Sequence, residues 1–87
     1  ISFSGTVTFK NAQEVRRSAL AVGPDHILVE TDCPFLSPEP VRKIRPNEPA
    51  FVAHTARFLA DLFGLPLECF SEKTFQNAQK VFGPKLI

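Results

Sequence analysis

Two carboxylates, Glu30 and Asp32, follow an apolar run in the stretch LVETDCPFL, residues 28–36. Alternation along a strand places both on the face that also carries Leu28. A buried carboxylate without a partner is costly, so it becomes protonated or binds a cation. With a divalent metal, Asp32 could hold the ion and accept a proton from water whose pKa the ion lowers. Alternatively, both carboxylates pair with Arg or Lys or cap neighbouring backbone, and spacing alone does not decide.

Three cations follow in a proline-rich segment. Residues 34–49 hold five prolines, at positions 34, 38, 40, 46 and 49, which predicts a stiff, exposed loop without helix or strand. Arg42, Lys43 and Arg45 lie in this loop. They could bind the phosphates that flank a scissile bond, or they could form a solvated basic loop without a ligand.

Other reactive side chains have plainer interpretations. Cys33 could be a nucleophile or a second metal ligand, but the sequence places no His or Asn partner beside it, which favours a small neutral role. His26 precedes a strand and His54 lies on a helix away from its apolar stripe, where surface or hydrogen-bonded histidines are expected. The nine phenylalanines fall mostly at core positions, which indicates packing instead of base stacking.

The carboxylates would be positioned by a strand–helix–strand unit over residues 1–30. Residues 1–9 alternate between apolar side chains and Ser or Thr, with Gly5 at a bend, which predicts a strand. Residues 27–29 are apolar on both faces, as in a parallel strand covered on both sides. The crossover rule then places the two strands parallel and adjacent.

Three helical segments are predicted around these strands. The first is capped by Asn11 and ends at Gly23. The second runs over about residues 49–63, with Asn47 as its cap and Gly64 as its end. The third runs over about residues 66–82, with a break near Ser71, and its predicted inner face consists of Phe75, Ala78, Val81 and Phe82.

The bulk properties limit the class of protein. A chain of 87 residues makes one small domain, and the net charge of +1 gives no general attraction to nucleic acid or membrane. No apolar run approaches the roughly 20 residues of a membrane span. Two cysteines indicate free thiols in a reducing compartment, which favours the cytoplasm. Two parallel strands cannot form an independent sheet, and the chain begins at Ile1 inside a strand pattern, so we expect a piece of a longer protein.

Several motifs occur together in a recognisable order. ISFSGTVTFKNA is followed by ILVETDCPFLSP and then by RPNEP, and a late element is matched by Thr74, Asn77 and Phe82. This arrangement resembles the C-terminal third of the TatD family of metal-dependent deoxyribonucleases. The resemblance covers essentially the whole chain, with Cys33 in place of the serine that usually follows the aspartate.

The resemblance implies an α/β fold in which residues 1–87 form the C-terminal portion of a single (β/α)₈ barrel domain. It implies a centre of one or two divalent metal ions (Mg, Mn or Zn) at the C-terminal face of the barrel. Asp32 matches the aspartate that binds metal and helps to activate water. Glu30, two residues deeper in the barrel, would orient Asp32 or pair with an inward base. The remaining ligands, an H-x-H pair, a glutamate and two histidines, would come from the missing N-terminal barrel segment. The 87-residue piece alone would then be inactive.

The predicted function is that of a metal-dependent hydrolase cleaving DNA phosphodiester bonds with metal-activated water. Asp32 and Glu30 would be catalytic, and Arg42, Lys43 and Arg45 would bind the DNA. One alternative is a non-catalytic α/β fragment or a weak nucleic-acid-binding module that uses the basic loop. Another is an ester or amide hydrolase of the same fold, because a barrel metal site does not by itself select phosphate. No membrane partner is expected, and unpaired strand edges would favour dimerisation or strand exchange.

Overall fold

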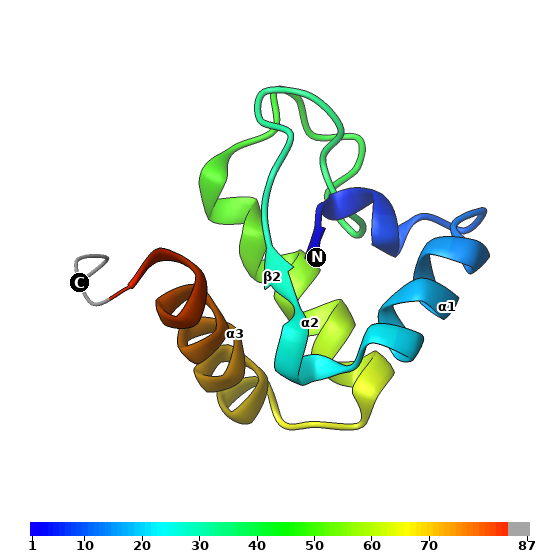
Figure 1. The fold of residues 1–87 in the computed structure, drawn as a ribbon. Coiled ribbons are helices and arrows are strands. Elements are labelled where there is room, and N and C mark those ends of the chain that lie inside the picture. The colour runs from blue at the N-terminus through cyan, green and yellow to red at the C-terminus, as the bar shows by residue number, and fades with distance from the viewer. Residues whose placement is uncertain (84–87) are drawn as a thin grey trace.

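The computed structural model describes residues 1–83 (Figure 1). Its regular elements are, in chain order, β1 (Ser2–Phe3), η1 (Gly5–Thr8), α1 (Gln13–Val22), η2 (Pro24–His26), β2 (Leu28–Val29), η3 (Pro49–Phe51), α2 (Val52–Phe63) and α3 (Leu67–Phe82), where η denotes a 3-10 helix. The fold is therefore mixed α/β, with mostly helices and one small parallel sheet.

The two strands confirm the predicted parallel pairing. Ser2 is in register with Leu28, and Phe3 with Val29. The Leu28 amide donates to the Ile1 carbonyl and the Glu30 amide donates to the Phe3 carbonyl, both at 2.9 Å. Since the second bond lies just beyond β2, it fixes the main chain that leads to the two carboxylates.

The predicted strand over residues 1–9 is wrong beyond Phe3, because Gly5–Thr8 forms a 3-10 helix. This turn places Val7 in the core, where its side chain is fully buried. Gly5 packs directly against the proline-rich loop, since a Cβ atom at this position would lie 2.8 Å from the Pro38 Cβ atom. The absence of a side chain at Gly5 thus permits the loop to approach η1.

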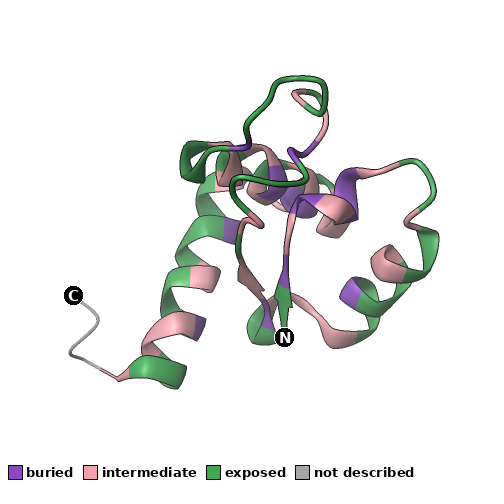
Figure 2. Cartoon of the chain, turned by 90° about the horizontal axis from the view of Figure 1, so that it is seen from above, coloured by how far each residue is buried: buried purple, intermediate pink, exposed green. Residues whose placement is uncertain are grey.

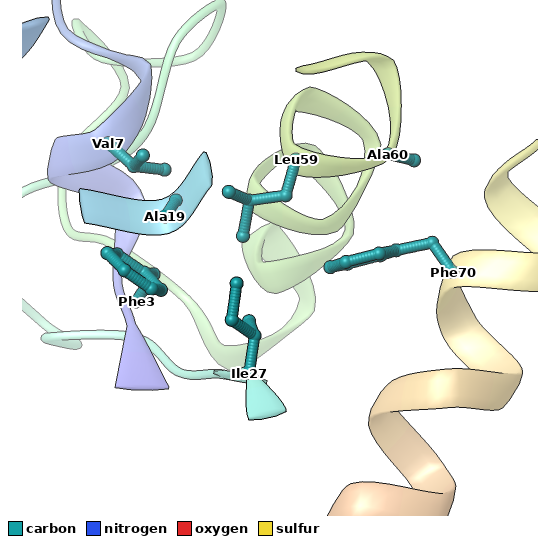
Figure 3. Close-up of a cluster of buried hydrophobic side chains, with 7 residues drawn as sticks. All are labelled: Phe3, Val7, Ala19, Ile27, Leu59, Ala60 and Phe70. Atoms are coloured by element: carbon teal, nitrogen blue, oxygen red, sulfur yellow. The ribbon is translucent and has the colours of Figure 1, made fainter. Parts of the chain in front are cut away.

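The core lies between the strands and the helices, with α2 at its centre (Figure 3). Its buried apolar residues are Phe3, Val7, Ala19, Ile27, Leu59, Ala60 and Phe70. In Figures 1 and 2, α2 lies behind the strand pair with α1 and α3 beside it, and no element within residues 1–83 covers the other face of the pair. The structure thus supplies cover for one of the two sheet faces.

The glycines correctly predicted where helices end, whereas the residue predicted to cap the start of the first helix was wrong. Gly23 and Gly64, with φ of 84° and 68°, end α1 and α2 as expected, because glycine tolerates positive φ. The prediction that Asn11 caps α1 is wrong: Ala12 occupies the N-cap position, without a side-chain hydrogen bond. None of the helices over residues 1–83 is both long and apolar enough to cross a membrane.

The third helix differs from its prediction in two ways. α3 is continuous through Ser71, whose carbonyl accepts a hydrogen bond of 2.9 Å from the Thr74 hydroxyl. The buried residues are Phe70 and Asn77, whereas three of the four residues predicted for its inner face, Phe75, Val81 and Phe82, are exposed. The helix packs on the core through a different face, and the predicted apolar stripe has no partner among the described residues.

Candidate metal and substrate site

Glu30 and Asp32 follow the carboxyl end of β2, as predicted, but the strand ends at Val29, so the placement of both carboxylates on one strand face stays a prediction. Glu30 is exposed and Asp32 is half-buried. Within residues 1–83, no hydrogen bond or ion pair reaches either carboxylate, so the described chain does not supply the Arg, Lys or backbone partners of the alternative interpretation. Nor does a hydrogen bond join the two carboxylates, and the orienting role of Glu30 stays a prediction.

The donor set fits part of a metal site. Asp32 offers two carboxylate oxygens, which are ligands suited to Mg²⁺, Mn²⁺ and Zn²⁺. Among the residues described, however, no group of three or more His, Cys, Asp or Glu side chains could hold a metal ion. A site built on Asp32 therefore needs further ligands from outside this part of the chain.

The proline-rich loop is tied down by one buried side chain, Asn47. Its amide donates to the carbonyls of Phe35 and Leu36, at 2.6 and 3.4 Å, and its oxygen accepts from the Glu48 amide at 2.8 Å. The Asn47 main-chain amide also donates to the Pro34 carbonyl at 2.8 Å. The prediction that Asn47 caps the second helix is therefore wrong, because its side chain holds the loop that follows the carboxylates.

A second set of contacts joins the loop to η1. The Thr8 hydroxyl donates to the Gly5 carbonyl at 2.6 Å and accepts from the Glu39 amide at 2.8 Å. Within the loop itself, the Ser37 hydroxyl donates to the Ile44 carbonyl at 2.7 Å. The prediction of a loop without helix or strand is confirmed up to Pro49, where η3 begins, but the loop is not exposed throughout, since Ser37, Pro38 and Asn47 are buried.

The three predicted DNA-binding cations have different surroundings. The Arg42 guanidinium carbon lies 3.8 Å from the centre of the Phe9 ring, which is a close cation–π contact. Arg42 and Arg45 line an open pocket of about 590 Å³, together with residues 34–37. Lys43 is exposed and does not line this pocket.

Two positioning side chains were missed from sequence. Arg16 on α1 donates to the carbonyls of Phe9 at 2.6 Å and of Val7 and Lys10 at 3.3 Å, which fixes the end of η1. Asn77 on α3 donates to the carbonyls of Pro24 and Ile27, both at 2.9 Å, which fixes the start of β2. The motif match at Asn77 was the available signal, but it did not indicate the two acceptors.

The remaining reactive side chains form no second site within residues 1–83. Cys33 and Cys69 are exposed free thiols. His54 packs its ring against Phe51, with the ring centres 6.0 Å apart, and His26 is exposed. A hydrogen bond of 2.8 Å from Lys73 holds the pKa of Asp25 below its usual value. This pair joins α3 to η2 at the surface.

Parallel strands, helices on one face and a carboxylate beyond the carboxyl end of a strand define a mixed α/β fold, and in open α/β sheets ligands generally bind at that end. The family model described as "TatD related DNase" matches residues 1–83. The chain therefore belongs to the TatD related DNase family.

Curated relatives agree with this membership. An uncharacterized metal-dependent hydrolase of Buchnera aphidicola subsp. Baizongia pistaciae is 48% identical over 82 residues, covering 94% of this chain and 31% of the relative. YcfH of Escherichia coli K12 is 44% identical, with 94% and 31% covered, and YabD of Bacillus subtilis is 42% identical, with 94% and 32% covered; both carry the same description. The chain thus spans about a third of the length of the curated relatives it matches.

Proposed function

We propose that the full-length protein is a metal-dependent hydrolase of DNA phosphodiester bonds. Residues 1–87 would then be the C-terminal portion of a (β/α)₈ barrel of about 250 residues. Membership of the TatD related DNase family and the relatives' description as metal-dependent hydrolases support this proposal. The uncovered sheet face supports the barrel, because the inner face of a barrel strand is covered by side chains of the other strands.

The observation that carries the proposal is the Asp32 carboxylate. It is half-buried beyond a parallel strand, and no side chain or amide within residues 1–83 is bonded to it. In this proposal Asp32 holds a divalent cation and accepts the proton of the attacking water at a carboxylate oxygen. When bound, the cation would lower the pKa of that water and stabilise the negative charge that develops on phosphate.

The remaining roles follow from charge. Arg42 and Arg45 would bind the non-bridging phosphate oxygens and fix the phosphodiester beside Asp32. Water forms a new bond to phosphorus, the bond to the leaving sugar oxygen breaks, and that oxygen takes up a proton. Glu30, which is exposed in the same segment, would orient the Asp32 carboxylate.

Asp32→Asn in the full-length protein tests the proposal. The amide keeps the shape but loses the charge and the basic oxygen, so we expect the rate to fall by about 10²-fold or more. Hydrolysis of DNA and of bis(p-nitrophenyl) phosphate should be measured with Mg²⁺, Mn²⁺ or Zn²⁺ and with EDTA. Asp61→Asn, on the exposed surface of α2, is the matched control. Activity that survives EDTA or Asp32→Asn contradicts the proposal.

A further inference from the structure

We infer that the pocket lined by residues 34–37, Arg42 and Arg45 binds one nucleotide of the substrate, with its base stacked on Phe35. The nucleotide pocket consists of residues 34–37, Arg42 and Arg45. The inference rests on the proposed function, because it specifies which part of the nucleic acid the loop binds. It also revises the expectation that the phenylalanines serve only in packing.

Phe35 is the unusual residue of this pocket. Its side chain is 71% exposed, whereas six of the nine phenylalanines are buried or half-buried. Phe9 also lines the pocket, but its ring already makes the cation–π contact with Arg42. An exposed aromatic ring costs free energy in water, and a base that stacks on it removes that ring from water without requiring a particular sequence.

The main chain holds Phe35 firmly in this exposed place. The Phe35 amide donates to the Asp32 carbonyl at 2.8 Å, so the aromatic residue and the proposed metal ligand belong to one turn. Leu36 has φ of 54°, a left-handed conformation that is uncommon outside glycine. The Asn47 side chain donates to the carbonyls of Phe35 and Leu36, which keeps the strained turn in place.

The charge of the pocket matches a nucleotide. Its lining holds two arginines and no acidic residue. No hydrogen bond or ion pair within residues 1–83 engages either guanidinium, and the contact recorded for Arg42 is with the Phe9 ring. An aromatic surface beside two cations therefore suits an unpaired base and its phosphate together, whereas a paired base in a duplex has no free face for Phe35.

The test is a binding cycle with the full-length protein in EDTA, where hydrolysis does not interfere. Fluorescence anisotropy should compare an oligonucleotide with a set carrying one abasic site at each position in turn. Phe35→Ala should weaken binding of the intact strand by about 5-fold to 150-fold, the range measured for loss of one stacked base. One abasic position should weaken the wild type similarly and remove the effect of Phe35→Ala.

Two controls accompany the cycle. Ile44→Ala removes an exposed apolar side chain of the same loop that does not line the pocket and should leave affinity unchanged, and Phe35→Tyr should restore it. Arg45→Ala should reduce the slope of log affinity against log salt by about one, a loss that Arg57→Ala, at an exposed position of α2, should not produce.

Additive losses at every abasic position, or equal affinities of wild type and Phe35→Ala, overturn the nucleotide pocket. Such a result would mean that Phe35 is covered or unused in the whole protein. Hydrolysis of bis(p-nitrophenyl) phosphate is measured separately. This substrate contains no base, so its hydrolysis tests the proposed hydrolase independently of the nucleotide pocket.

Discussion

At the scale of single residues, the site depends on side chains that do no chemistry. Asn47 is 3% exposed and makes three side-chain hydrogen bonds, all to the main chain around the nucleotide pocket. A buried polar group that loses its partners costs more than the bond itself contributes, because water cannot replace the lost partner. The position of Phe35 relative to Asp32 therefore depends on a residue twelve positions further along the chain.

Asn47→Ala should lower the free energy of unfolding of the full-length protein by about 1–3 kcal/mol, because two carbonyls and one amide lose their partner. Urea denaturation measures this loss. Asn11→Ala is the control, since Asn11 is exposed and its side chain makes no hydrogen bond within residues 1–83. Equal stability of Asn47→Ala and wild type would contradict the assigned role.

Residue types and spacing predicted the position of Asp32 after a parallel strand but not the surroundings of its side chain. A carboxylate beyond an apolar run is visible in the sequence, because strand position and chemistry are both local. The exposed Phe35 was not predicted, because burial depends on the path of the whole loop. Asn47 was assigned to the helix that it precedes, since an Asn before a helix usually caps it, and the competing carbonyls lie 11 and 12 residues earlier.

At the scale of elements, α3 determines where β2 begins. Asn77 is buried and bonds the carbonyls of Pro24 and Ile27, so the helix holds the strand at the end opposite to the carboxylates. The Lys73–Asp25 pair adds a weak surface contact between α3 and η2. Displacement of α3 would therefore shift β2 and the carboxylates that follow it.

Asn77→Ala should increase hydrogen exchange at the amides of Leu28 and Glu30, which bond to Ile1 and Phe3 across the sheet. Loss of the two anchoring bonds makes local opening of this short pairing cheaper. Exchange in the full-length protein, followed by NMR or mass spectrometry, measures the effect. Gln76→Ala, on an exposed position of the same helix, should leave both amides unchanged. Unchanged exchange in Asn77→Ala would show that α3 does not fix the strand.

Element type was easier to predict than element length. The parallel pair and all three α-helices follow from apolar periodicity and from glycines at helix ends. The strand over residues 1–9 failed because Val7 reaches the core by a 3-10 turn, and alternation does not distinguish a continued strand from such a turn. The inner face of α3 failed because two apolar stripes were available, and packing used the one with Phe70.

At the scale of the whole molecule, residues 1–83 expose several large apolar side chains on their helices. Phe75 and Phe82 on α3 are 47% and 62% exposed, and Leu20 on α1 is 51% exposed. One face of the strand pair is uncovered as well (Figure 1). Large exposed apolar patches favour association with other surfaces, which the remaining two thirds of a relative-sized protein would provide.

The 87-residue chain alone should self-associate and bind a hydrophobic dye, and it should hydrolyse no phosphodiester. The full-length protein should neither self-associate nor bind the dye. Sedimentation velocity and dye fluorescence measure the difference, and Phe75→Ser with Phe82→Ser in the short chain should reduce dye binding. A short chain that is monomeric and binds no dye would contradict this expectation.

The close approach of Gly5 to Pro38 restricts how the proline-rich loop can be exchanged between relatives. Any relative whose turn carries a methyl group or larger at that place must route its proline-rich segment differently. Exchange of residues 34–48 between such relatives would therefore disturb the packing unless residues 5–8 were exchanged as well. The two segments should thus be substituted together.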